Sequence, residues 1–192
     1  LKSPENVRGF GCSKKTNNSV TLSWSIDSYA DGYEIEQYCE GEWINVATLS
    51  GAASSFTIED LNTITRYEFR IRAYKNDGSN VLYGNYMTCN AITLMNNITG
   101  LVCSNTTDDS ITLKWEPVSD AKGYEIDQYI NGSWVNIWSV TDSVNNMGEI
   151  TGLTPGVVYE FRVRAYNNTY GLVFNDYVYI NAKTLLGPMT GF

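Results

Sequence analysis

Apolar and polar residues alternate along most of this chain, and a period of two is typical of half-buried β-strands. In the stretch "SVTLSW", Val20, Leu22 and Trp24 share one face and the hydroxyl side chains share the other. The stretches 32–38 and 67–74 alternate in the same way. The apolar residues of these segments do not follow the spacing of an amphipathic helix, so the pattern predicts strands.

Turn-forming sequences separate these strands at short intervals, for example at 29–32, 40–42 and 76–78. Each stretch of about 90 residues therefore holds seven short strands, and each strand has one apolar face. Two sheets that bury such faces against each other form a β-sandwich. The sequence predicts an all-β fold.

The pattern also repeats. "YEFRIRAY" at 67–74 returns as "YEFRVRAY" at 159–166, and Trp24 and Trp115 lie 91 residues apart, as do Tyr33 and Tyr124. A match of this extent indicates a tandem duplication. We expect one domain at 1–94 and a second at 95–186. The closing octet 185–192 is similar to the junction 94–101, so we expect 187–192 to begin a linker to a following unit.

The repeated positions resemble a fibronectin type III domain, in which a Trp ends the second strand, a Tyr opens the third and a Leu-x5-Tyr-x-Phe pattern leads into the sixth. This resemblance covers the whole chain. It implies two seven-stranded immunoglobulin-like sandwiches, with Tyr67 and Tyr159 as corner tyrosines whose hydroxyls bond to loop backbone. The expected structural residues are Trp24, Tyr33, Leu61, Tyr67, Trp115, Tyr124, Leu153 and Tyr159.

The two copies differ at the turn before the sixth strand. The second copy has "LTPG" at 153–156, which the family favours, whereas the first has "LNTI" at 61–64. The departure concerns the rigidity of this turn in the first copy. The fold prediction is the same for both.

Charged residues on the outer faces form a second repeated pattern. Glu34 and Glu36 should neighbour Arg70 and Arg72, and the second copy keeps the pattern at 125, 127, 162 and 164. Opposite charges across a strand pair contribute about 0.2–1 kcal/mol each. We interpret the carboxylates as part of this ladder and not as a paired-carboxylate active site.

Composition excludes several functions. The net charge of −8 and the pI near 4.5 oppose binding to nucleic acid or to an anionic membrane surface. The chain contains no histidine and no phosphate-binding loop or serine-nucleophile motif, so we expect no enzyme. We also expect no cofactor and no metal, because Asp27, Asp31, Asp108 and Asp109 lack the oxygen spacing of a dedicated calcium site.

Four cysteines leave two alternatives. Cys39 and Cys89 align with Ile130 and Ile180, which favours buried free thiols that act as small apolar side chains. A Cys39–Cys89 bridge is the other possibility. Cys12 and Cys103 occupy equivalent positions in separate copies and cannot pair within one domain.

Aromatic residues provide the candidate binding surface. Tyr38 and Tyr74 are predicted to point outward beside Trp43, and the second copy repeats the set. Such rings can bind the faces of sugars, or they can cover the outer sheet and the arginine stems. The candidate binding residues are Tyr38, Trp43, Tyr74, Tyr129, Trp134, Trp138 and Tyr166.

The Asn- and Tyr-rich sequences of the two copies resemble bacterial fibronectin type III repeats. That resemblance implies a secreted or surface-anchored multidomain protein, in which the pair is a non-catalytic, monomeric spacer between neighbouring domains. The short junction at 95–97 predicts limited hinge motion. The alternative is a module that binds a polysaccharide or a surface protein through its aromatic face. No membrane insertion is expected, because no apolar run approaches 18 residues.

Overall fold

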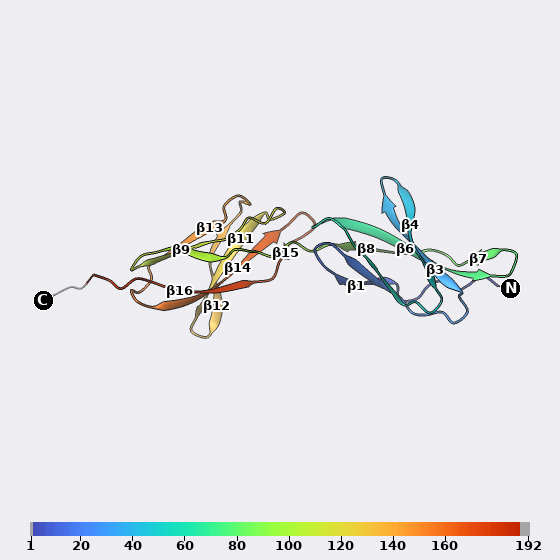
Figure 1. Ribbon diagram of the computed structural model, residues 1–192, viewed down its shortest axis with the longest axis horizontal. Coiled ribbons are helices and arrows are strands. Elements are labelled where there is room, and N and C mark those ends of the chain that lie inside the picture. The colour runs from blue at the N-terminus through green and yellow to red at the C-terminus, as the bar shows by residue number, and fades with distance from the viewer. Residues whose placement is uncertain (1, 189–192) are drawn as a thin grey trace. The chain divides into compact units, whose positions relative to one another are not determined.

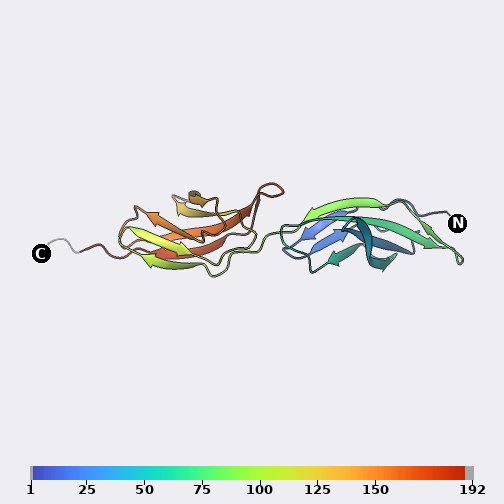
Figure 2. The same ribbon diagram turned by 90° about the horizontal axis from the view of Figure 1, so that it is seen from above.

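The protein is described by a computed structural model that covers residues 2–188; the predicted linker start at 187–192 lies mostly outside this range. The chain divides into two compact units, residues 1–94 and 95–192. Within residues 2–188 every regular element is a β-strand, and each unit is a two-sheet sandwich. Figure 1 labels most of these strands, and Figure 2 shows them in two layers within each unit. The all-β prediction is confirmed.

The first unit has a small sheet and a large sheet. The small sheet has the order β1-β2-β5, and the large one has the order β4-β3-β6-β7, with β8 also paired to β6. All of these pairs are antiparallel. The strands are β1 (Gly11–Lys15), β2 (Val20–Ser23), β3 (Gly32–Cys39), β4 (Glu42–Ser50), β5 (Ser55–Ile58), β6 (Arg66–Asn76), β7 (Val81–Tyr83) and β8 (Met87–Ile92).

The second unit repeats this topology. Its small sheet has the order β13-β10-β9, and its large sheet has the order β12-β11-β14-β15, with β16 also paired to β14. The strands are β9 (Val102–Thr106), β10 (Ser110–Lys114), β11 (Gly123–Ile130), β12 (Ser133–Val140), β13 (Met147–Thr151), β14 (Val158–Asn167), β15 (Val173–Phe174) and β16 (Val178–Lys183).

Each unit therefore has eight strand segments where the pattern predicts seven strands. The difference lies in the last strand, which is broken into β7 and β8 in the first unit. Both segments pair with β6, and the Gly84 N–H between them donates to the Ala73 carbonyl at 3.0 Å. The two segments are one interrupted seventh strand, so the predicted topology holds.

The core of each unit lies between its two sheets and is built from the predicted apolar faces. Val20, Leu22, Phe69 and Ile71 are fully buried, as are their counterparts in the second unit. Trp24 packs on Tyr33 with ring centroids 5.4 Å apart. Trp115 packs on Tyr124 at 5.2 Å in the same tilted arrangement. These aromatic pairs bury large apolar areas against the sheets.

The corner tyrosines bond as the sequence predicts. The Tyr67 hydroxyl accepts the Asn62 N–H at 2.8 Å, and the Tyr159 hydroxyl accepts the Thr154 N–H at 2.7 Å. The preceding turns differ in backbone strain. Gly156 has φ +72° in the second unit, whereas Ile64 has φ +44° at the equivalent position of the first. A β-branched residue rarely adopts this region, so the first turn carries strain.

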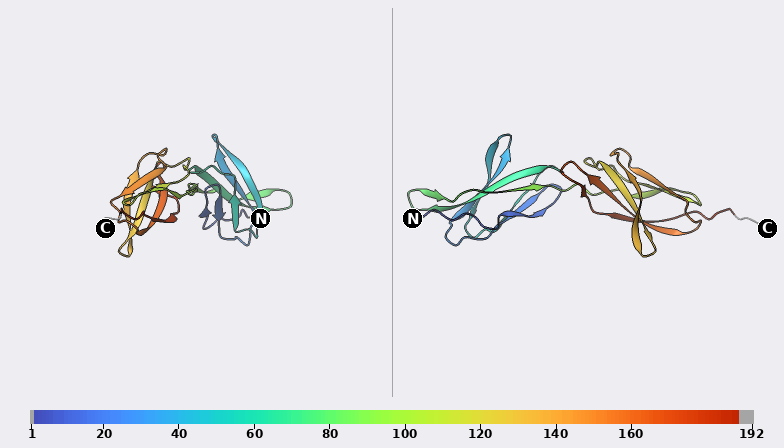
Figure 3. Two further views of the ribbon diagram at one scale, coloured as in Figure 1. Left: turned by 60° about the vertical axis from the view of Figure 1, so that its left-hand side comes forward. Right: turned by 180° about the vertical axis from the view of Figure 1, so that it is seen from behind.

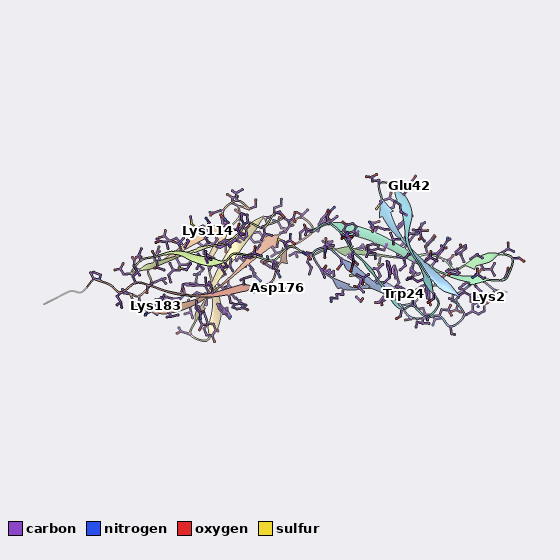
Figure 4. The ribbon with its side chains drawn as sticks, viewed as in Figure 1. Lys2, Trp24, Glu42, Lys114, Asp176 and Lys183 are labelled. Carbon is purple, nitrogen blue, oxygen red and sulfur yellow. The ribbon has the colours of Figure 1, made fainter. Side chains whose placement is uncertain are left out.

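The hairpin formed by β3 and β4 extends away from the rest of the first unit, as Figures 1 and 3 show. Glu42, labelled in Figure 4, lies near its tip. A β-bulge interrupts the β3–β4 register between Ile35 and Glu36. The same bulge occurs between β11 and β12, at Ile126 and Asp127. It sets which side chains of β4 and β12 face the core.

Candidate functional site

The predicted charge ladder is present on the outer face of the large sheet in each unit. In the first unit Glu34 lies opposite Arg72, and Glu36 lies opposite Arg70. Arg70 Nε donates to Glu36 at 2.6 Å, and Arg72 Nε donates to Glu34 at 2.9 Å. These four side chains are between 12% and 24% exposed. They are therefore better shielded from solvent than an ordinary surface ion pair.

Aromatic rings enclose these guanidinium groups. The Arg70 guanidinium lies 4.5 Å from the Trp43 ring centroid and 3.8 Å from the Tyr86 centroid. Arg72 lies 4.7 Å from Tyr86 and 3.6 Å from Tyr83. The rings and cations thus alternate across the sheet at cation–π distances. We call the set Trp43, Arg70, Tyr86, Arg72 and Tyr83, with its carboxylates, the arginine ladder.

The second unit builds the same arginine ladder from Trp134, Arg162, Tyr177, Arg164 and Phe174. Arg162 lies 4.7 Å from Trp134 and 3.7 Å from Tyr177. Arg164 lies 4.6 Å from Tyr177 and 3.5 Å from Phe174. The ion pairs Arg162–Asp127 and Arg164–Glu125 measure 2.9 Å and 2.7 Å. The predicted opposition of charges is therefore observed in both units.

Burial and hydrogen bonding shift the titration of these groups. Burial, helped by a 2.6 Å hydrogen bond to Glu36, raises the pKa of Tyr86 to about 12. Burial likewise raises the pKa of Tyr177. At Asp127 burial raises the pKa, but hydrogen bonds from Tyr177, Asn136 and Arg162 outweigh it, so the pKa is lowered. Tyr86 and Tyr177 therefore stay protonated at neutral pH, and Asp127 stays ionised.

The ladder limits how the guanidinium groups could bind a ligand. Each guanidinium has a carboxylate partner and two aromatic rings within cation–π distance, so its faces and part of its donor capacity are already used. A ligand would have to displace these contacts to bind an arginine of the ladder. Within residues 2–188 no group of three or more Cys, Asp or Glu side chains is placed to hold a metal ion.

In each unit, two of the predicted binding residues lie together at the tryptophan end of the arginine ladder. Tyr38 and Trp43 pack with ring centroids 5.2 Å apart, and Tyr129 and Trp134 do so at the same distance. Tyr179 adds an edge contact to Trp134 at 5.6 Å. Tyr38 and Tyr129 are exposed. Tyr179 is exposed as well, so exposed rings lie beside the tryptophan of each ladder.

The placement predicted for Tyr74 and Tyr166 beside the tryptophans is wrong. Tyr74 lies opposite Gly32, whereas Trp43 lies opposite Tyr38, six residues further along β3. At about 3.3 Å per residue this separates Tyr74 from Trp43 by roughly 20 Å. A Cβ on Gly32 would come within 2.4 Å of the Tyr74 hydroxyl, so the ring covers this glycine. Alternation predicted the correct face but not the position along it.

Tyr166 covers Gly123 in the same way, and its hydroxyl donates to the Val140 carbonyl at 3.3 Å. It also contacts Phe174, with ring centroids 6.3 Å apart. Tyr166 therefore closes the far end of the second arginine ladder. It is not part of the Tyr129 and Trp134 cluster.

Trp138 is not on the outer face, contrary to the prediction. Its ring makes an edge contact with the buried Trp115 at 6.1 Å, and Gly148 leaves room for it. The β-bulge explains the difference. Trp134 and Asn136 share the outer face, but the register shifts before Trp138, which pairs with the inward-facing Ile126. A bulge adds one residue and reverses the alternation beyond it.

Sequence reasoning missed Tyr86, Tyr83, Tyr177 and Phe174 as members of the ladders. Tyr86 and Tyr177 precede β8 and β16, in the interruption of the last strand, so strand alternation does not place them. The available signal was the repeat itself, because both pairs keep the 91-residue offset and an aromatic ring.

All four cysteines are free thiols in the described residues. Cys39 lies on β3 and Cys89 on β8, with β6 between them. Two strand spacings of nearly 5 Å separate their backbones by about 9–10 Å, beyond the reach of a disulfide. Cys39 and Cys89, predicted to be buried, are only partly buried, and Cys12 is exposed on the edge strand β1.

Comparisons with known proteins agree with this geometry. The family model for the fibronectin type III domain matches residues 3–88 and again 96–178. A two-domain fibronectin type III segment of chicken tenascin has a TM-score of 0.64, with 18% identity over 93% of this chain and 99% of that segment. This likeness concerns the fold.

Curated relatives include human receptor-type tyrosine-protein phosphatase H, which is 27% identical over 173 residues. Mouse tenascin is 28% identical over 166 residues. The match covers 86% and 83% of this chain but only 15% and 7% of those proteins, so the chain spans a small part of their length. The repeated match of the family model to most of the chain, together with the paired sandwiches, shows that this chain belongs to the fibronectin type III domain family.

Proposed function

We propose that this chain is a non-catalytic spacer, a pair of modules that holds neighbouring domains of a larger protein at a limited range of distances and orientations. Tandem fibronectin type III domains are typical of multidomain proteins, and their fold is typically non-catalytic. The observation that carries the proposal is how firmly each unit holds its own side of the junction.

In the first unit, the backbone is held by hydrogen bonds up to Leu94. The Leu94 N–H donates to the Thr16 carbonyl at 2.8 Å, and its carbonyl accepts the Ile64 N–H at 3.4 Å. Both partners belong to the first unit. The last residue of this unit is therefore anchored on both of its backbone groups.

On the second side, bonding resumes at Asn96. Asn175 Nδ2 donates to the Asn96 carbonyl at 2.9 Å, while Asn175 Oδ1 accepts the Ala165 N–H on β14 at 2.8 Å. The Asp176 N–H also donates to Asn97 Oδ1 at 3.2 Å. Asp176, labelled in Figure 4, lies between β15 and β16. Asn175 thus ties the junction to the central strand of the second unit.

Only Met95 stands between these two anchors, and consecutive Cα atoms are about 3.8 Å apart. A junction with one residue between hydrogen-bonded positions, itself buried, differs from a flexible linker, whose reach grows with the square root of its length. This supports a stiff connection with limited hinge motion.

The first unit holds its own lead-in segment at the equivalent place. Gly84 corresponds to Asn175, and a Cβ at Gly84 would lie 3.0 Å from the Glu5 carbonyl oxygen and 3.1 Å from that of Pro4. The interrupted last strand is thus the point where each unit contacts the chain that enters it. A repeated contact of this kind suits modules joined in series.

The arginine ladders support the same role. Their rings and carboxylates stabilise the outer face of the large sheet and occupy the faces and part of the donor capacity of the guanidinium groups. The partners proposed for the pair are the adjacent domains of the parent protein, with the pair itself a monomer. The resemblance of the repeats to bacterial modules supports a secreted or surface-anchored parent.

A second candidate function is binding of a polysaccharide or a surface protein. The observation in its favour is the cluster of Tyr129, Trp134 and Tyr179, in which both tyrosines are exposed and the ring centroids lie 5.2 Å and 5.6 Å apart. The cluster in the first unit has only Tyr38 and Trp43. The rest of the predicted platform does not join either cluster.

Binding assays on the intact chain separate the two functions. Glycan arrays and sedimentation with insoluble polysaccharides should show no retention if the pair is a spacer. Retention that is lost in Trp134→Ala and kept in the matched Trp43→Ala would overturn the spacer proposal and support the binding function. Retention of both variants would also count against a pure spacer.

A further inference from the structure

Two of the free thiols lie on neighbouring strands at the edge of the first sandwich, Cys12 on β1 and Cys89 on β8. Cys12 on β1 lies opposite Leu22, and Cys89 on β8 lies opposite Phe69. Leu22 and Phe69 are fully buried, so both cysteines occupy positions on the inner faces of their sheets. The two sheets are different, because β1 belongs to the small sheet and β8 to the large one.

The two strands also lie close together. Cα atoms of β1 come within 8 Å of Cα atoms of β8, although the strands share no hydrogen-bonded ladder. Cys89 packs against the core cluster, while Cys12 is exposed at the edge. Burial, with a smaller contribution from the charge of Cys12, raises the pKa of Cys89 to about 11.

The backbone around Cys12 can adjust to a bond. β1 is an edge strand with one neighbour, and its register shifts at a bulge between Cys12 and Lys14. A disulfide needs Cα atoms about 4.4–6.8 Å apart. An edge strand with a bulge can move by a small distance more easily than a central strand.

We propose that Cys12 and Cys89 are a disulfide-forming site, which joins the first and last strands of the first unit when a small-molecule disulfide is present as oxidant. Cys39 is excluded as a partner by the intervening strand. Cys103 in the second unit has no thiol opposite it, because Ile180 stands where the first unit has Cys89.

The chemistry follows from exposure. The sulfur of Cys12, as thiolate, attacks the small disulfide, breaks its S–S bond and releases one small thiol. The sulfur of Cys89 then loses its proton to solvent and attacks the Cys12 sulfur, which forms the protein disulfide and releases the second small thiol. The two protein thiols are oxidised and the small disulfide is reduced to two thiols. Because Cys89 is rarely ionised at neutral pH, the second step should accelerate as pH rises towards 11.

The bond would close a loop of nearly the whole first unit. Cross-links that close long loops restrict the unfolded chain most, in the loop-entropy model. The first unit would then resist unfolding more strongly in an oxidising environment than in a reducing one. The second unit would not change.

The test is to treat the intact chain with oxidised glutathione, denature it, alkylate the remaining thiols and map the peptides by mass spectrometry. We expect a mass 2 Da lower before alkylation, a cross-linked peptide pair that contains Cys12 and Cys89, and alkylation at Cys39 and Cys103. Cys103 is the internal control, since it occupies the same position without a partner. A stable glutathione adduct at Cys12, or alkylation of both Cys12 and Cys89, would refute the proposal.

Two variants keep this test independent of a failure to fold. Cys89→Ile copies the second unit and should leave Cys12 open to alkylation or glutathione. Ile180→Cys should allow a second cross-link to Cys103. Circular dichroism would check that both variants fold. Oxidation should raise the melting temperature of the first unit by at least about 5 °C in the wild type and not in Cys89→Ile; equal shifts in both proteins would contradict the assignment.

Discussion

Asp127→Asn should destabilise the second unit strongly, although it changes only one charge. The Asp127 side chain is 6% exposed and the Arg162 side chain 20%. The amide keeps the shape of the carboxylate, but it leaves the guanidinium between Trp134 and Tyr177 without an opposite charge. Breaking a buried pair in this way costs about 3–5 kcal/mol. Because Arg162 keeps some contact with solvent, we expect a loss of about 2–4 kcal/mol.

Equilibrium urea unfolding of the intact chain measures this loss in the transition assigned to the second unit. The matched surface control is Glu5→Gln, which removes the Arg8 ion pair whose side chains are 62% and 80% exposed. That variant should change stability by less than about 1 kcal/mol. The double variant Asp127→Asn with Arg162→Met should recover much of the loss, because no unpaired charge remains.

The reasoning fails if Asp127→Asn costs no more than Glu5→Gln. It also fails if the double variant is less stable than Asp127→Asn alone by as much as the loss of a second buried contact would cost. In either case the arginine ladder would be a surface network whose rings do not desolvate the charges. A change of m-value would instead indicate an altered unfolded state and would require a different probe.

Three further predictions concern the turns and the titrating groups. Tyr159→Phe removes the hydroxyl that accepts the Thr154 N–H, so the second unit should lose about 1–3 kcal/mol in urea unfolding; no loss would mean that water replaces the bond. Ile64→Gly should stabilise the first unit by about 1 kcal/mol, because glycine adopts φ +44° without strain, whereas the matched Gly156→Ala should destabilise the second unit. A loss of stability in Ile64→Gly would show that the packing of the Ile64 side chain outweighs the backbone strain. The first unit should lose stability between about pH 9 and pH 12. In the folded state the pKa values of Tyr86 and Cys89 are raised to about 12 and about 11. The unfolded chain therefore loses these protons at lower pH than the folded chain, which favours unfolding as the pH rises. Unfolding midpoints measured across this range should fall more in the wild type than in Cys89→Ile, and a flat profile would refute the shifts.

The alternation of the sequence was enough to predict the two sandwiches, since each strand has one buried face and the repeat confirms the pairing. It also predicted the ion pairs, because residues two apart on neighbouring strands lie on one face. The same rule placed Trp138 on the wrong face. A bulge at Ile126 and Asp127 reverses the alternation, and nothing in the local sequence marks it.

Position along a face was harder to predict than the face itself. Tyr74 and Trp43 both point outward, yet they lie at opposite ends of β3 because strand register sets the distance between them. Tyr86 joins the ladder from a break in the last strand, where no alternation holds. These contacts depend on the folded arrangement of several strands, which a single segment does not encode.

The most direct test of the spacer account is the alignment of the two units in solution. Residual dipolar couplings measured on the intact chain give one alignment tensor for each unit. We expect tensors of similar magnitude and orientation in the wild type, and clearly different ones after insertion of Gly-Ser-Gly-Ser between Leu94 and Met95. Independent tensors in the wild type, matching those of the insertion variant, would contradict a stiff junction and with it the proposed function.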